Sequence, residues 1–432
     1  MTATARIDPA QLLDAEARLM ADHSADLDHA RSVAARDGVD ADAVVAELAR
    51  FSVAAPSWAL GTGSTRFGRF PGPGEPRTTE EKLDDVAAVN ALTGANRTIS
   101  LHVPWDDPAD PAALRDYAAA LGIGFDAMNS NTFQDNPSTT GGGSASYKFG
   151  SLAAVDPVVR KLAVEHNAYC IELGQRLGST ALTVWLADGT NHPGQASFRG
   201  QFERVAAGLA EIHGLLPADW TLLTEHKPYE PAFYSSVNAD WGSSLLLAQA
   251  AGPQTRCLVD LGHHLPGANI EQIVARLSMV GRLGGFHFND SKYGDDDLTV
   301  GSIHPYQLFL IVLELVEHGG GRMPDLAYMV DESHNVKDPL EDLIQATDAL
   351  QVAVAQALLV DRSALAAAQH ADDVAAAQEV LHRAYRSDVR PIVREARRRN
   401  GAALDPLAAF RALGYRAAVT ELRGRDARAT GL

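Results

Sequence analysis

Residues 255–297 read TRCLVDLGHHLPGANIEQIVARLSMVGRLGGFHFNDSKYGDDD and decide the fold of this chain. Two short apolar runs in this stretch, residues 256–260 and 284–288, are each followed by acidic and imidazole side chains. The residues between the runs place their apolar side chains at helical spacing, which predicts the order strand, loop, helix, strand, loop. The polar residues are therefore predicted at the carboxyl ends of two parallel strands. In parallel α/β proteins, this edge of the sheet carries the functional site.

The same alternation of strand and helix continues on both sides of this stretch. Capping residues support the helices: Thr78 with Glu81 forms a capping box, and Asp110 followed by Pro111 begins a later helix. Eight stretches have the composition of strands: residues 51–60, 97–105, 122–133, 179–189, 219–227, 256–260, 284–288 and 326–333. Eight strands that alternate with helices predict an α/β fold, a single (β/α)8 TIM barrel.

Helical segments extend the predicted barrel at both ends. We expect an N-terminal helical extension over residues 1–50, the catalytic barrel over residues 51–350, and a C-terminal helical extension with subunit contacts over residues 351–432. The last segment is rich in arginine around residues 394–399. We interpret these arginines as a solvated helix face, and the alternative is a contact with an acidic neighbouring subunit.

Composition narrows the classes of partner. The chain has 432 residues and a net charge of −18, which argues against nucleic acid or an anionic membrane because phosphate binding relies on clustered basic residues. An acidic pocket suits divalent metal ions instead.

Cys170 and Cys257 stand in apolar segments without metal-type spacing and are predicted to be buried free thiols. Because the N-terminus has no apolar run and no stretch reaches the length of a membrane span, we expect a cytoplasmic protein.

Candidate metal ligands stand at the ends of four consecutive predicted strands. They are Glu225, Asp260, His287 and Asp331. Since a barrel gathers its strand ends around one axis, these residues are expected to converge. Three carboxylates and one imidazole suit Mn²⁺, Mg²⁺ or Co²⁺ better than a structural zinc ion. A second set, His263 with Asp295 and Asp297, lies further out and is consistent with a second ion, with Asp260 or Glu225 as a bridge.

Each candidate ligand also has a structural interpretation. A single Asp or His at a strand end is more often a cap or a hydrogen-bond partner than a ligand. Four such residues together favour a metal, because like charges brought together need a neutralising cation. For Asp295 and Asp297, in the sequence GDDD, a solvated turn is an equal alternative. We interpret His264 and Asp290 as structural, since residues adjacent to the candidate ligands point elsewhere.

A lysine and several aromatic residues complete the predicted pocket. Only 6 of the 37 basic residues are lysines, so a lysine in a strand stands out. Lys227 follows Glu225 by two positions, and on a strand both side chains face the same side; a surface salt bridge is the alternative for Lys227. The matching strand-end residues on the other half of the barrel are Trp58, His102, Phe133 and Trp185. Such aromatic faces either pack in a core or stack on the C–H surface of a sugar.

Four motifs resemble, in order and spacing, the metal-site segments of the xylose-isomerase-like barrels: TEHKPYEPAFYS, CLVDLGHH, GGFHFNDSKYGDDDLTVGSI and YMVDESHN. More narrowly, they are similar to the bacterial L-rhamnose isomerase branch of that family. The resemblance extends from about Trp58 to Asn335. It implies a (β/α)8 barrel, a homotetramer, and interconversion of an aldose and a ketose with two divalent ions per subunit, Mn²⁺ first and Mg²⁺ or Co²⁺ as alternatives.

The resemblance also implies roles for individual residues. The implied ligands of a structural ion are Glu225, Asp260, His287 and Asp331, and those of a catalytic ion are His263, Asp295 and Asp297. The residues implied to shape the sugar pocket are Trp58, His102, Phe133, Trp185 and Ser333. Lys227 would hold the substrate oxygen at C1. Phe67, in the Gly/Pro-rich loop after the first strand, would close the site of a neighbouring subunit.

The implied function is metal-dependent aldose–ketose isomerisation, with L-rhamnose to L-rhamnulose as the first candidate and L-lyxose, L-mannose and D-allose as side substrates. Hydrogen moves between C1 and C2 by a hydride shift or an enediol route. We expect Lys227, Asp331 and His263 to be the catalytic residues. The alternatives are a sugar 3-epimerase of the same superfamily, an abasic-site endonuclease on the same barrel, and a barrel that only binds sugars. The second ligand set argues against the epimerase, and the acidic charge argues against the endonuclease.

Overall fold

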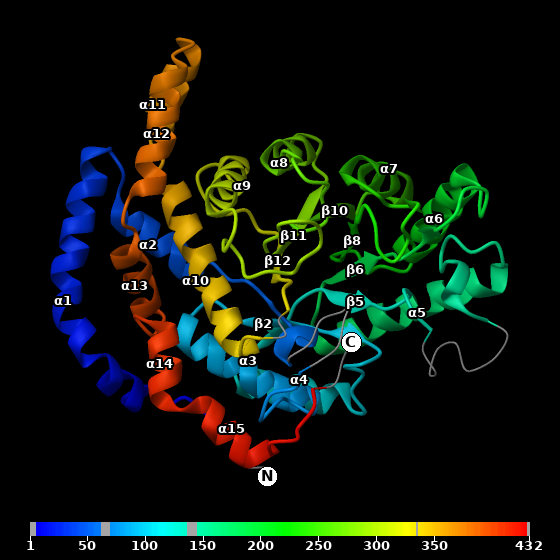
Figure 1. Cartoon of the computed structure of the whole chain (residues 1–432), viewed down its shortest axis with the longest axis horizontal. Coiled ribbons are helices and arrows are strands. Elements are labelled where there is room, and N and C mark those ends of the chain that lie inside the picture. The colour runs from blue at the N-terminus through cyan, green and yellow to red at the C-terminus, as the bar shows by residue number, and fades with distance from the viewer. Residues whose placement is uncertain (1–5, 62–69, 136–144, 334–335, 430–432) are drawn as a thin grey trace.

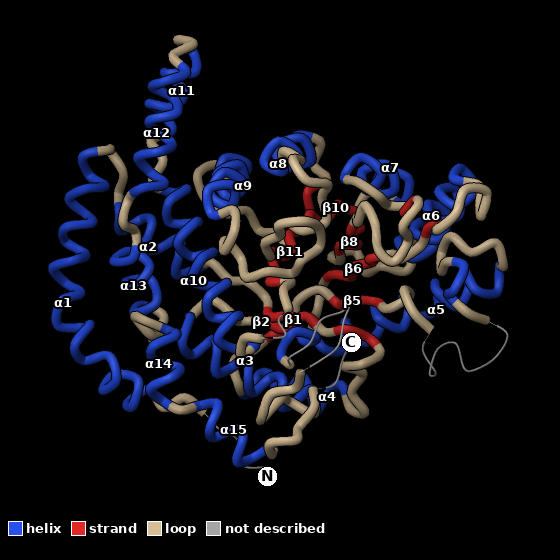
Figure 2. The backbone as a smooth tube through the Cα atoms, in the orientation of Figure 1, coloured by secondary structure: helices blue, strands red, loops and turns tan. Residues whose placement is uncertain are grey.

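The structure, a computed structural model, describes residues 6–61, 70–135, 145–333 and 336–429. Short parallel strands lie at the centre, and helices surround them (Figures 1 and 2). All eight predicted stretches contribute strands: β1 (Ala55–Pro56), β2 (Thr98–Ser100) with β3 (His102–Val103), β4 (Gly124–Phe125) with β5 (Met128–Ser130), β6 (Ala181–Trp185), β8 (Thr221–Glu225), β10 (Thr255–Asp260), β11 (Leu283–Phe288) and β12 (Ala327–Val330).

The strands pair in parallel with their neighbours in the chain. One sheet has the order β12-β11-β10-β8-β6-β5-β3, and a second has the order β1-β2-β4. A parallel bridge between Ala54 and Met329 joins the first strand segment to the last. The fold is therefore a TIM-barrel-like α/β fold. Asp260 is paired with His287 across β10 and β11, so this register brings two of the predicted ligands side by side.

The second and third predicted strands are each interrupted. Side chains bind backbone carbonyl groups at the interruption: Ser100 Oγ donates to the carbonyl of Ala127 at 2.6 Å, and Asn129 Nδ2 donates to the carbonyl of Leu101 at 3.2 Å. These bonds join the second predicted strand to the third at the points where each is interrupted, and the apolar pattern of the two strands does not reveal them.

A small antiparallel sheet of β7 (Gly189–Thr190) and β9 (Ser235–Ser236) was not predicted. The fourth predicted strand extends to residue 189, whereas β6 ends at Trp185. A Cβ atom on Gly189 would lie 2.2 Å from the carbonyl oxygen of Ser235, so this close pairing needs glycine. The sheet fixes the loop after β8 beside the loop after β6.

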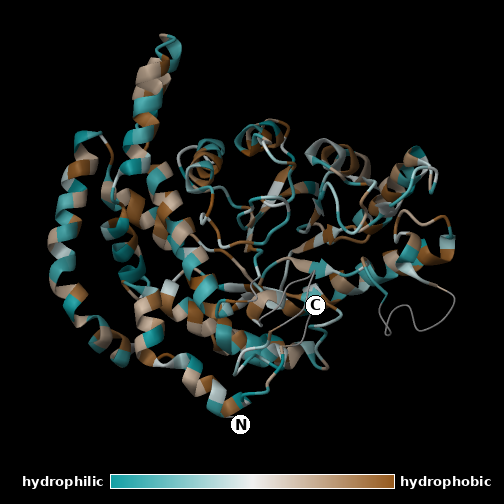
Figure 3. Cartoon of the chain, viewed as in Figure 1, coloured by the Kyte–Doolittle hydropathy of each residue, from teal (hydrophilic) through white to brown (hydrophobic). Residues whose placement is uncertain are grey.

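Helices α3 to α10 follow the strands in the predicted order. Both predicted N-cap residues are confirmed: Thr78 Oγ1 accepts from the backbone N–H of Glu81 at 3.3 Å, and Asp110 Oδ1 accepts from that of Ala112 at 3.0 Å. The return bond of the predicted capping box differs, because Glu81 Oε2 accepts from the backbone N–H of Arg77 at 2.6 Å. Figure 3 shows hydrophobic and hydrophilic residues mixed along these helices, as expected for helices with one buried face. Their bounds are α3 (Thr79–Thr93), α4 (Pro111–Ala120), α5 (Pro157–Leu177), α6 (Phe198–His213), α7 (Trp241–Ala251), α8 (Ile270–Met279), α9 (Pro305–His318) and α10 (Pro339–Leu358), with 3₁₀ turns η1 (Ser57–Leu60) and η2 (Tyr147–Phe149).

Helices from the two ends of the chain pack together. They are α1 (Pro9–Arg36), α2 (Ala41–Arg50), α11 (Arg362–His370), α12 (Val374–Arg386), α13 (Arg390–Arg399), α14 (Pro406–Leu413) and α15 (Tyr415–Arg423). Helix α1 contacts α13 and α14, and α2 contacts α13, while α11 and α12 project together from the body (Figure 1). Among the described residues no single helix is long and apolar enough to cross a membrane; one pair, α10 and α11, bent by 60°, meets that criterion jointly.

The arginine-rich helix α13 is only partly solvated. The side chain of Arg397 is 3% exposed, pairs with Asp348, and donates from Nε to Gln351 Oε1 at 2.8 Å. Arg398 and Arg399 bind Glu395 and keep 48% and 37% of their side chains exposed. The interpretation of these arginines as a solvated face is therefore wrong for Arg397, because α10 packs against this face of α13.

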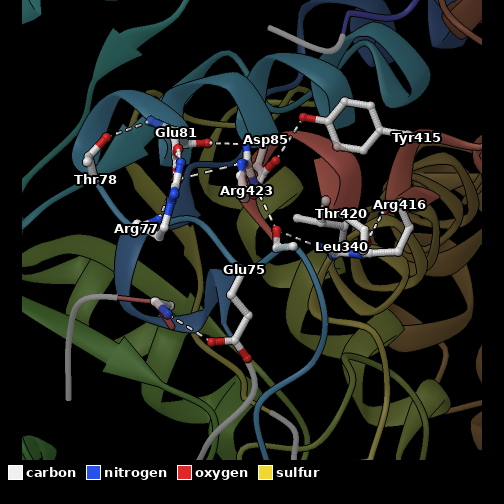
Figure 4. A network of polar contacts seen from close by, with 12 residues as sticks. Glu75, Arg77, Thr78, Glu81, Asp85, Leu340, Tyr415, Arg416, Thr420 and Arg423 are labelled. Carbon is white, nitrogen blue, oxygen red and sulfur yellow. Dashed lines mark hydrogen bonds and ion pairs between the residues drawn. The ribbon is translucent and has the colours of Figure 1, made fainter. Parts of the chain in front are cut away.

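A buried network joins α15 to α3 (Figure 4). Arg423 Nη1 donates to Asp85 Oδ2 at 2.8 Å and to the carbonyl of Gly74 at 3.1 Å. Tyr415 donates its hydroxyl to Asp85 Oδ1 at 2.8 Å. Burial raises the pKa of Asp85, and Arg423 opposes that shift. The carboxylate of Asp85 thus depends on the guanidinium of Arg423 for its charge.

We expect Arg423→Leu to lower the free energy of unfolding by about 3 to 5 kcal/mol, because it leaves Asp85 buried without a cation. Urea unfolding of the two proteins measures the difference. The control is Arg411→Leu, whose side chain is 64% exposed beside Glu341 and which should unfold like the parent protein. Equal stability of Arg423→Leu and the parent would show that this ion pair does not hold the C-terminal helix.

Candidate metal centre

Four side chains meet at the carboxyl ends of β8, β10, β11 and β12. His287 Nδ1 lies 3.2 Å from Glu225 Oε1, 3.2 Å from Asp331 Oδ2 and 3.7 Å from Asp260 Oδ2. One ligand atom from each of the four residues lies within 4.8 Å of the others. The structure thus brings together the four residues that the sequence placed at consecutive strand ends. We call them the inner group.

A second group of ligand atoms overlaps the first. Asp260, His263 and Asp295 also offer atoms within 4.8 Å of one another, and His263 Nε2 lies 3.3 Å from Asp295 Oδ1. Asp260 therefore belongs to both groups, as expected of a bridging ligand. Asp297 is not a member of the second group, although its side chain lines the same cavity. We call Asp260, His263 and Asp295 the outer group.

The residues present fit a divalent cation. Asp260 Oδ1 accepts from the backbone N–H of Gly262 at 2.8 Å and from Asn289 Nδ2 at 2.9 Å. Asp260 Oδ2 is buried and has no hydrogen-bond donor among the described residues, although a buried carboxylate oxygen needs a partner. A Cβ atom on Gly262 would lie 3.2 Å from Asp295 Oδ1, so glycine keeps space between the two carboxylates. Oxygen and imidazole donors of this kind suit Mn²⁺, Mg²⁺ or Co²⁺.

The charges of the two groups are strongly coupled. Burial disfavours the charged form of His263 and His287, but the surrounding carboxylates raise the pKa of both imidazoles well above its ordinary value. Burial also opposes ionisation of Glu225. The two imidazoles, His287 and His263, outweigh the effect of burial and lower the pKa of the Glu225 carboxyl. For Asp331 burial prevails, and its pKa is raised. The carboxylates of the two groups are therefore stabilised by nearby positive charge, which either a proton on an imidazole or a metal cation can supply.

Lys227 stands beside the outer group. Its Nζ lies 2.5 Å from Asp295 Oδ2, 3.5 Å from Glu230 Oε2 and 5.2 Å from the centre of the Trp185 ring. Burial favours the neutral amine, but Asp295 together with Glu230 and Asp297 outweighs burial, and the pKa of Lys227 is raised. Only 9% of the side chain is exposed. The alternative of a surface salt bridge is therefore wrong, and Lys227 places an ammonium group in the cavity.

A cavity of about 500 Å³ opens above the two groups. Its aromatic wall includes Phe133 and Trp185, whose rings meet edge to face at 4.7 Å. Trp58 Nε1 donates to Asp331 Oδ1 at 2.9 Å. The lining residues are Trp58, His102, Asn129, Ser130, Phe133, Gln134, Thr183, Trp185, Glu225, Lys227, Glu230, Pro231, Phe233, His263, His287, Asp295, Asp297 and Asp331. A concave site with an apolar wall and convergent polar groups is typical of small-molecule binding.

Two residues implied by the resemblance are not placed in this wall. Ser333 does not line the cavity; its backbone N–H donates to the carbonyl of Asp297 at 3.3 Å. Phe67 lies outside the described residues. His264 and Asp290, interpreted as structural, belong to neither group: the ring of His264 packs edge-on against His226, and Asp290 Oδ2 accepts from the backbone N–H of His304 at 2.8 Å.

Several lining residues were missed by sequence reasoning. Glu230 follows Lys227 by three positions and has a φ of 67°, which is uncommon for a residue with a side chain. Thr183 is a polar residue within the apolar strand β6, and this contrast was an available signal; Asn129 stands in the short polar strand β5, where the contrast is absent. Trp105 is not a lining residue, but its ring packs behind the wall against His102 and Phe133, with ring centres 6.3 and 6.0 Å away. It stands in a turn after β3, where no periodicity indicates the direction of a side chain.

His102 is expected to make stability depend on pH. Burial lowers its pKa to about 4, whereas an unfolded histidine titrates near 6.5. Between these values the unfolded chain binds a proton that the folded chain does not, so the free energy of unfolding falls as pH falls. We expect His102 to contribute a loss of about 1 to 2 kcal/mol between pH 7 and pH 5. Urea unfolding of chelator-treated parent and His102→Phe measures it; an equal pH effect in both proteins would contradict the assignment.

The fold and the site together define a class: a TIM-barrel-like α/β protein with carboxylates and imidazoles gathered at the carboxyl ends of its strands. No family model matches the chain. One solved structure, that of an L-ribulose 3-epimerase, has a TM-score of 0.53 and 17% identity, covering 71% of this chain and 95% of the epimerase. At this identity the likeness shows the fold alone. It agrees with the barrel-like pairing of the strands.

Two curated relatives are far more similar in sequence. A probable sugar isomerase of Rhizobium meliloti (strain 1021) is 54% identical over 391 residues, which is 90% of each chain. A probable sugar isomerase of Mesorhizobium japonicum is 54% identical over 390 residues, again 90% of each chain. The chain belongs to this family of probable sugar isomerases.

Proposed function

We propose that this protein is a metal-dependent aldose–ketose isomerase, with L-rhamnose as its aldose and L-rhamnulose as its ketose. One observation carries the proposal: two ligand groups share Asp260 beneath one cavity, and the ammonium of Lys227 adjoins the outer group. Relatives named probable sugar isomerases that match 90% of the chain support an activity on sugars. The choice of L-rhamnose rests on the motif resemblance.

Two ions per subunit are proposed, with Mn²⁺ preferred over Mg²⁺ and Co²⁺. The inner group would hold one ion, and the outer group, with Asp297 as a further ligand, would hold the other. When bound, a divalent ion polarises a carbonyl and lowers the pKa of a hydroxyl on the adjacent carbon. This is the chemistry that an exchange of hydrogen between C1 and C2 requires.

The proposed reaction assigns a separate task to each polar side chain. Lys227, whose ammonium stays charged beside Asp295, stabilises negative charge on the oxygen at C1. Asp331 lines the cavity and accepts a hydrogen bond from the indole of Trp58, and in the proposed reaction it carries a proton between the oxygens at C1 and C2. His263 lies between Glu225 and Asp295 and keeps the outer carboxylate in place.

The remaining wall of the cavity provides the proposed sugar pocket. Phe133 and Trp185 present aromatic surface of the kind that stacks on sugar C–H groups. The imidazole of His102 is neutral at pH 7, since its pKa is lowered to about 4, so it can both donate and accept hydrogen bonds. A preference between a methyl and a hydroxymethyl group at C6 amounts to about 1 to 3 kcal/mol in such a pocket. L-Lyxose, L-mannose and D-allose are therefore proposed as side substrates.

A sugar 3-epimerase is the second candidate. The sequence argument against an epimerase was the second set of ligands, His263 with Asp295 and Asp297. This argument is weaker in the structure, because Asp297 is not a member of the outer group. The four-ligand inner group alone would serve a one-metal enzyme in which two carboxylates act as acid and base. The two candidates use the same cavity and differ in the carbon at which hydrogen moves.

One experiment tests both candidates. The protein is treated with EDTA, reloaded with Mn²⁺, Mg²⁺ or Co²⁺, and incubated with L-rhamnose, L-lyxose, L-mannose, D-allose and their ketoses. Chromatography then follows the products. Ketose formed from an aldose supports the isomerase, and a second ketose formed from a ketose supports the epimerase. Equal behaviour of EDTA-treated and metal-loaded protein would refute the metal proposal in either form.

The proposed isomerase is a homotetramer. Light scattering after size-exclusion chromatography would report four times the chain mass. A monomer at all concentrations would refute this assembly without affecting the proposed chemistry.

A further inference from the structure

A fully buried ion pair lies outside both ligand groups. Lys82 of α3 and Asp106, which follows β3, have side chains that are 0% exposed, and Nζ lies 2.6 Å from Oδ1. Lysine is among the residue types least often buried, and this chain has only six lysines. Neither the inner nor the outer group accounts for this pair.

The second oxygen of Asp106 binds two further elements. Ser57 Oγ donates to Asp106 Oδ2 at 2.6 Å, and the backbone N–H of His102 donates to the same oxygen at 2.9 Å. The backbone N–H of Asp106 in turn donates to the carbonyl of His102 at 2.9 Å. A single carboxylate thus joins α3, the 3₁₀ turn η1 and the first residue of β3.

Both of these elements carry residues of the cavity wall. His102 is itself a lining residue. Ser57 directly precedes Trp58, whose Nε1 donates to Asp331 Oδ1 at 2.9 Å. A continuous set of contacts therefore leads from Lys82 through Asp106 and Ser57 to the indole that binds a member of the inner group.

Stability alone does not explain the pair. Removing two charges from water is costly, and apolar residues of similar volume often stabilise a buried site as well or better. Helix α3 offers a comparison, because its Asp85 forms a second buried ion pair, with Arg423 of α15 (Figure 4). That pair also binds Tyr415 and the carbonyl of Gly74 and touches no lining residue in the contacts described above. Of these two pairs, the one formed by Lys82 and Asp106 is the one whose contacts lead to lining residues.

We propose that Lys82 and Asp106 are positioning residues that fix the strand ends bearing Trp58 and His102, and through Trp58 the carboxylate of Asp331. The effect on turnover rests on the proposed function. The expected change in the position of the Trp58 indole does not rest on the proposed function, since that position is a property of the folded chain. Misplacing a binding group by about 1 Å can reduce catalysis by about 100-fold.

The test compares Asp106→Asn and Ser57→Ala with the control Asp85→Asn. The chain has five tryptophans, so ¹⁵N-labelled indole groups give few resonances, and Trp58→Phe assigns that of Trp58. We expect the Trp58 resonance to move by more than its linewidth in Asp106→Asn and Ser57→Ala and to stay in place in Asp85→Asn. Turnover per metal-loaded enzyme should fall about 10- to 100-fold in Asp106→Asn, about fivefold in Ser57→Ala, and less than twofold in Asp85→Asn.

The outcomes separate the inference from the proposed function. Ser57→Ala removes one hydroxyl and provides a folded variant if Asp106→Asn does not fold. An unmoved Trp58 resonance in Ser57→Ala overturns the proposal, as does an equal shift in Asp85→Asn. If the parent protein converts no sugar, the proposed function fails, and a shifted Trp58 resonance in the two variants still supports the positioning role.

Discussion

Asp260→Asn is expected to lower kcat/KM by about 10³-fold or more and to release bound metal. Asp260 offers a ligand atom to both the inner and the outer group, and its Oδ2 has no hydrogen-bond donor among the described residues. An amide has the shape of a carboxylate but lacks its charge, so the change weakens both proposed ions at once. Lewis-acid stabilisation is worth several kcal/mol, and each 1.36 kcal/mol corresponds to about tenfold in rate.

Metal content after dialysis, measured by mass spectrometry, and turnover of the reloaded protein check this result. The matched control is Asp290→Asn, a buried carboxylate just after β11 that lies outside both groups and binds the backbone N–H groups of Ile303 and His304. That variant should lose stability but keep its metal. If Asp260→Asn retained both metal and turnover, neither ligand group would be a metal site.

Lys227→Ala is expected to lower kcat by about 10² to 10³-fold while the metal content stays that of the parent. The ammonium lies 2.5 Å from Asp295 but is not itself a ligand. The proposed role is to stabilise charge at the substrate oxygen, and removal of one such donor in other enzymes costs about 2.7 to 4 kcal/mol of transition-state stabilisation. The effect should appear in kcat more than in KM, because the charge develops during reaction.

Parallel measurements of metal content, kcat and KM test this separation. Lys161→Ala is the control, because its side chain is 76% exposed and pairs only with Glu165 among the described residues. It should match the parent in all three quantities. Normal turnover in Lys227→Ala would exclude the proposed role of the ammonium, and loss of metal together with turnover would make Lys227 a support for Asp295 instead.

The convergence of the inner group could be predicted from the sequence. Periodicity identifies a strand within a few residues, and a parallel barrel brings all strand ends to one face. Glu225, Asp260 and His287 each stand within or at the end of a regular strand, where backbone register fixes the direction of the side chain. Lys227 was placed by the alternation of a strand that would run through residue 227. Because β8 ends at Glu225, its position in the cavity does not depend on strand register.

Residues in loops could not be placed in this way. Asp295 and Asp297 stand two positions apart and look equivalent in the sequence, yet only Asp295 joins the outer group. Asp297 has a φ of 50°, a left-handed conformation that no periodic pattern signals. Ser333, three residues beyond β12, likewise makes a backbone contact instead of lining the cavity.

The sequence by itself determined the alternation of strands and helices, the strand-end carboxylates and imidazoles, and the excess of negative charge that calls for a cation. These properties depend on local periodicity and on residue type. Only the tertiary structure decided that Asp260 belongs to both groups, that Arg397 is buried, and that Lys82 and Asp106 form a buried ion pair whose carboxylate binds Ser57 and the backbone of His102. Such contacts join residues far apart in the chain, and their distances depend on how whole elements pack, which no local pattern encodes.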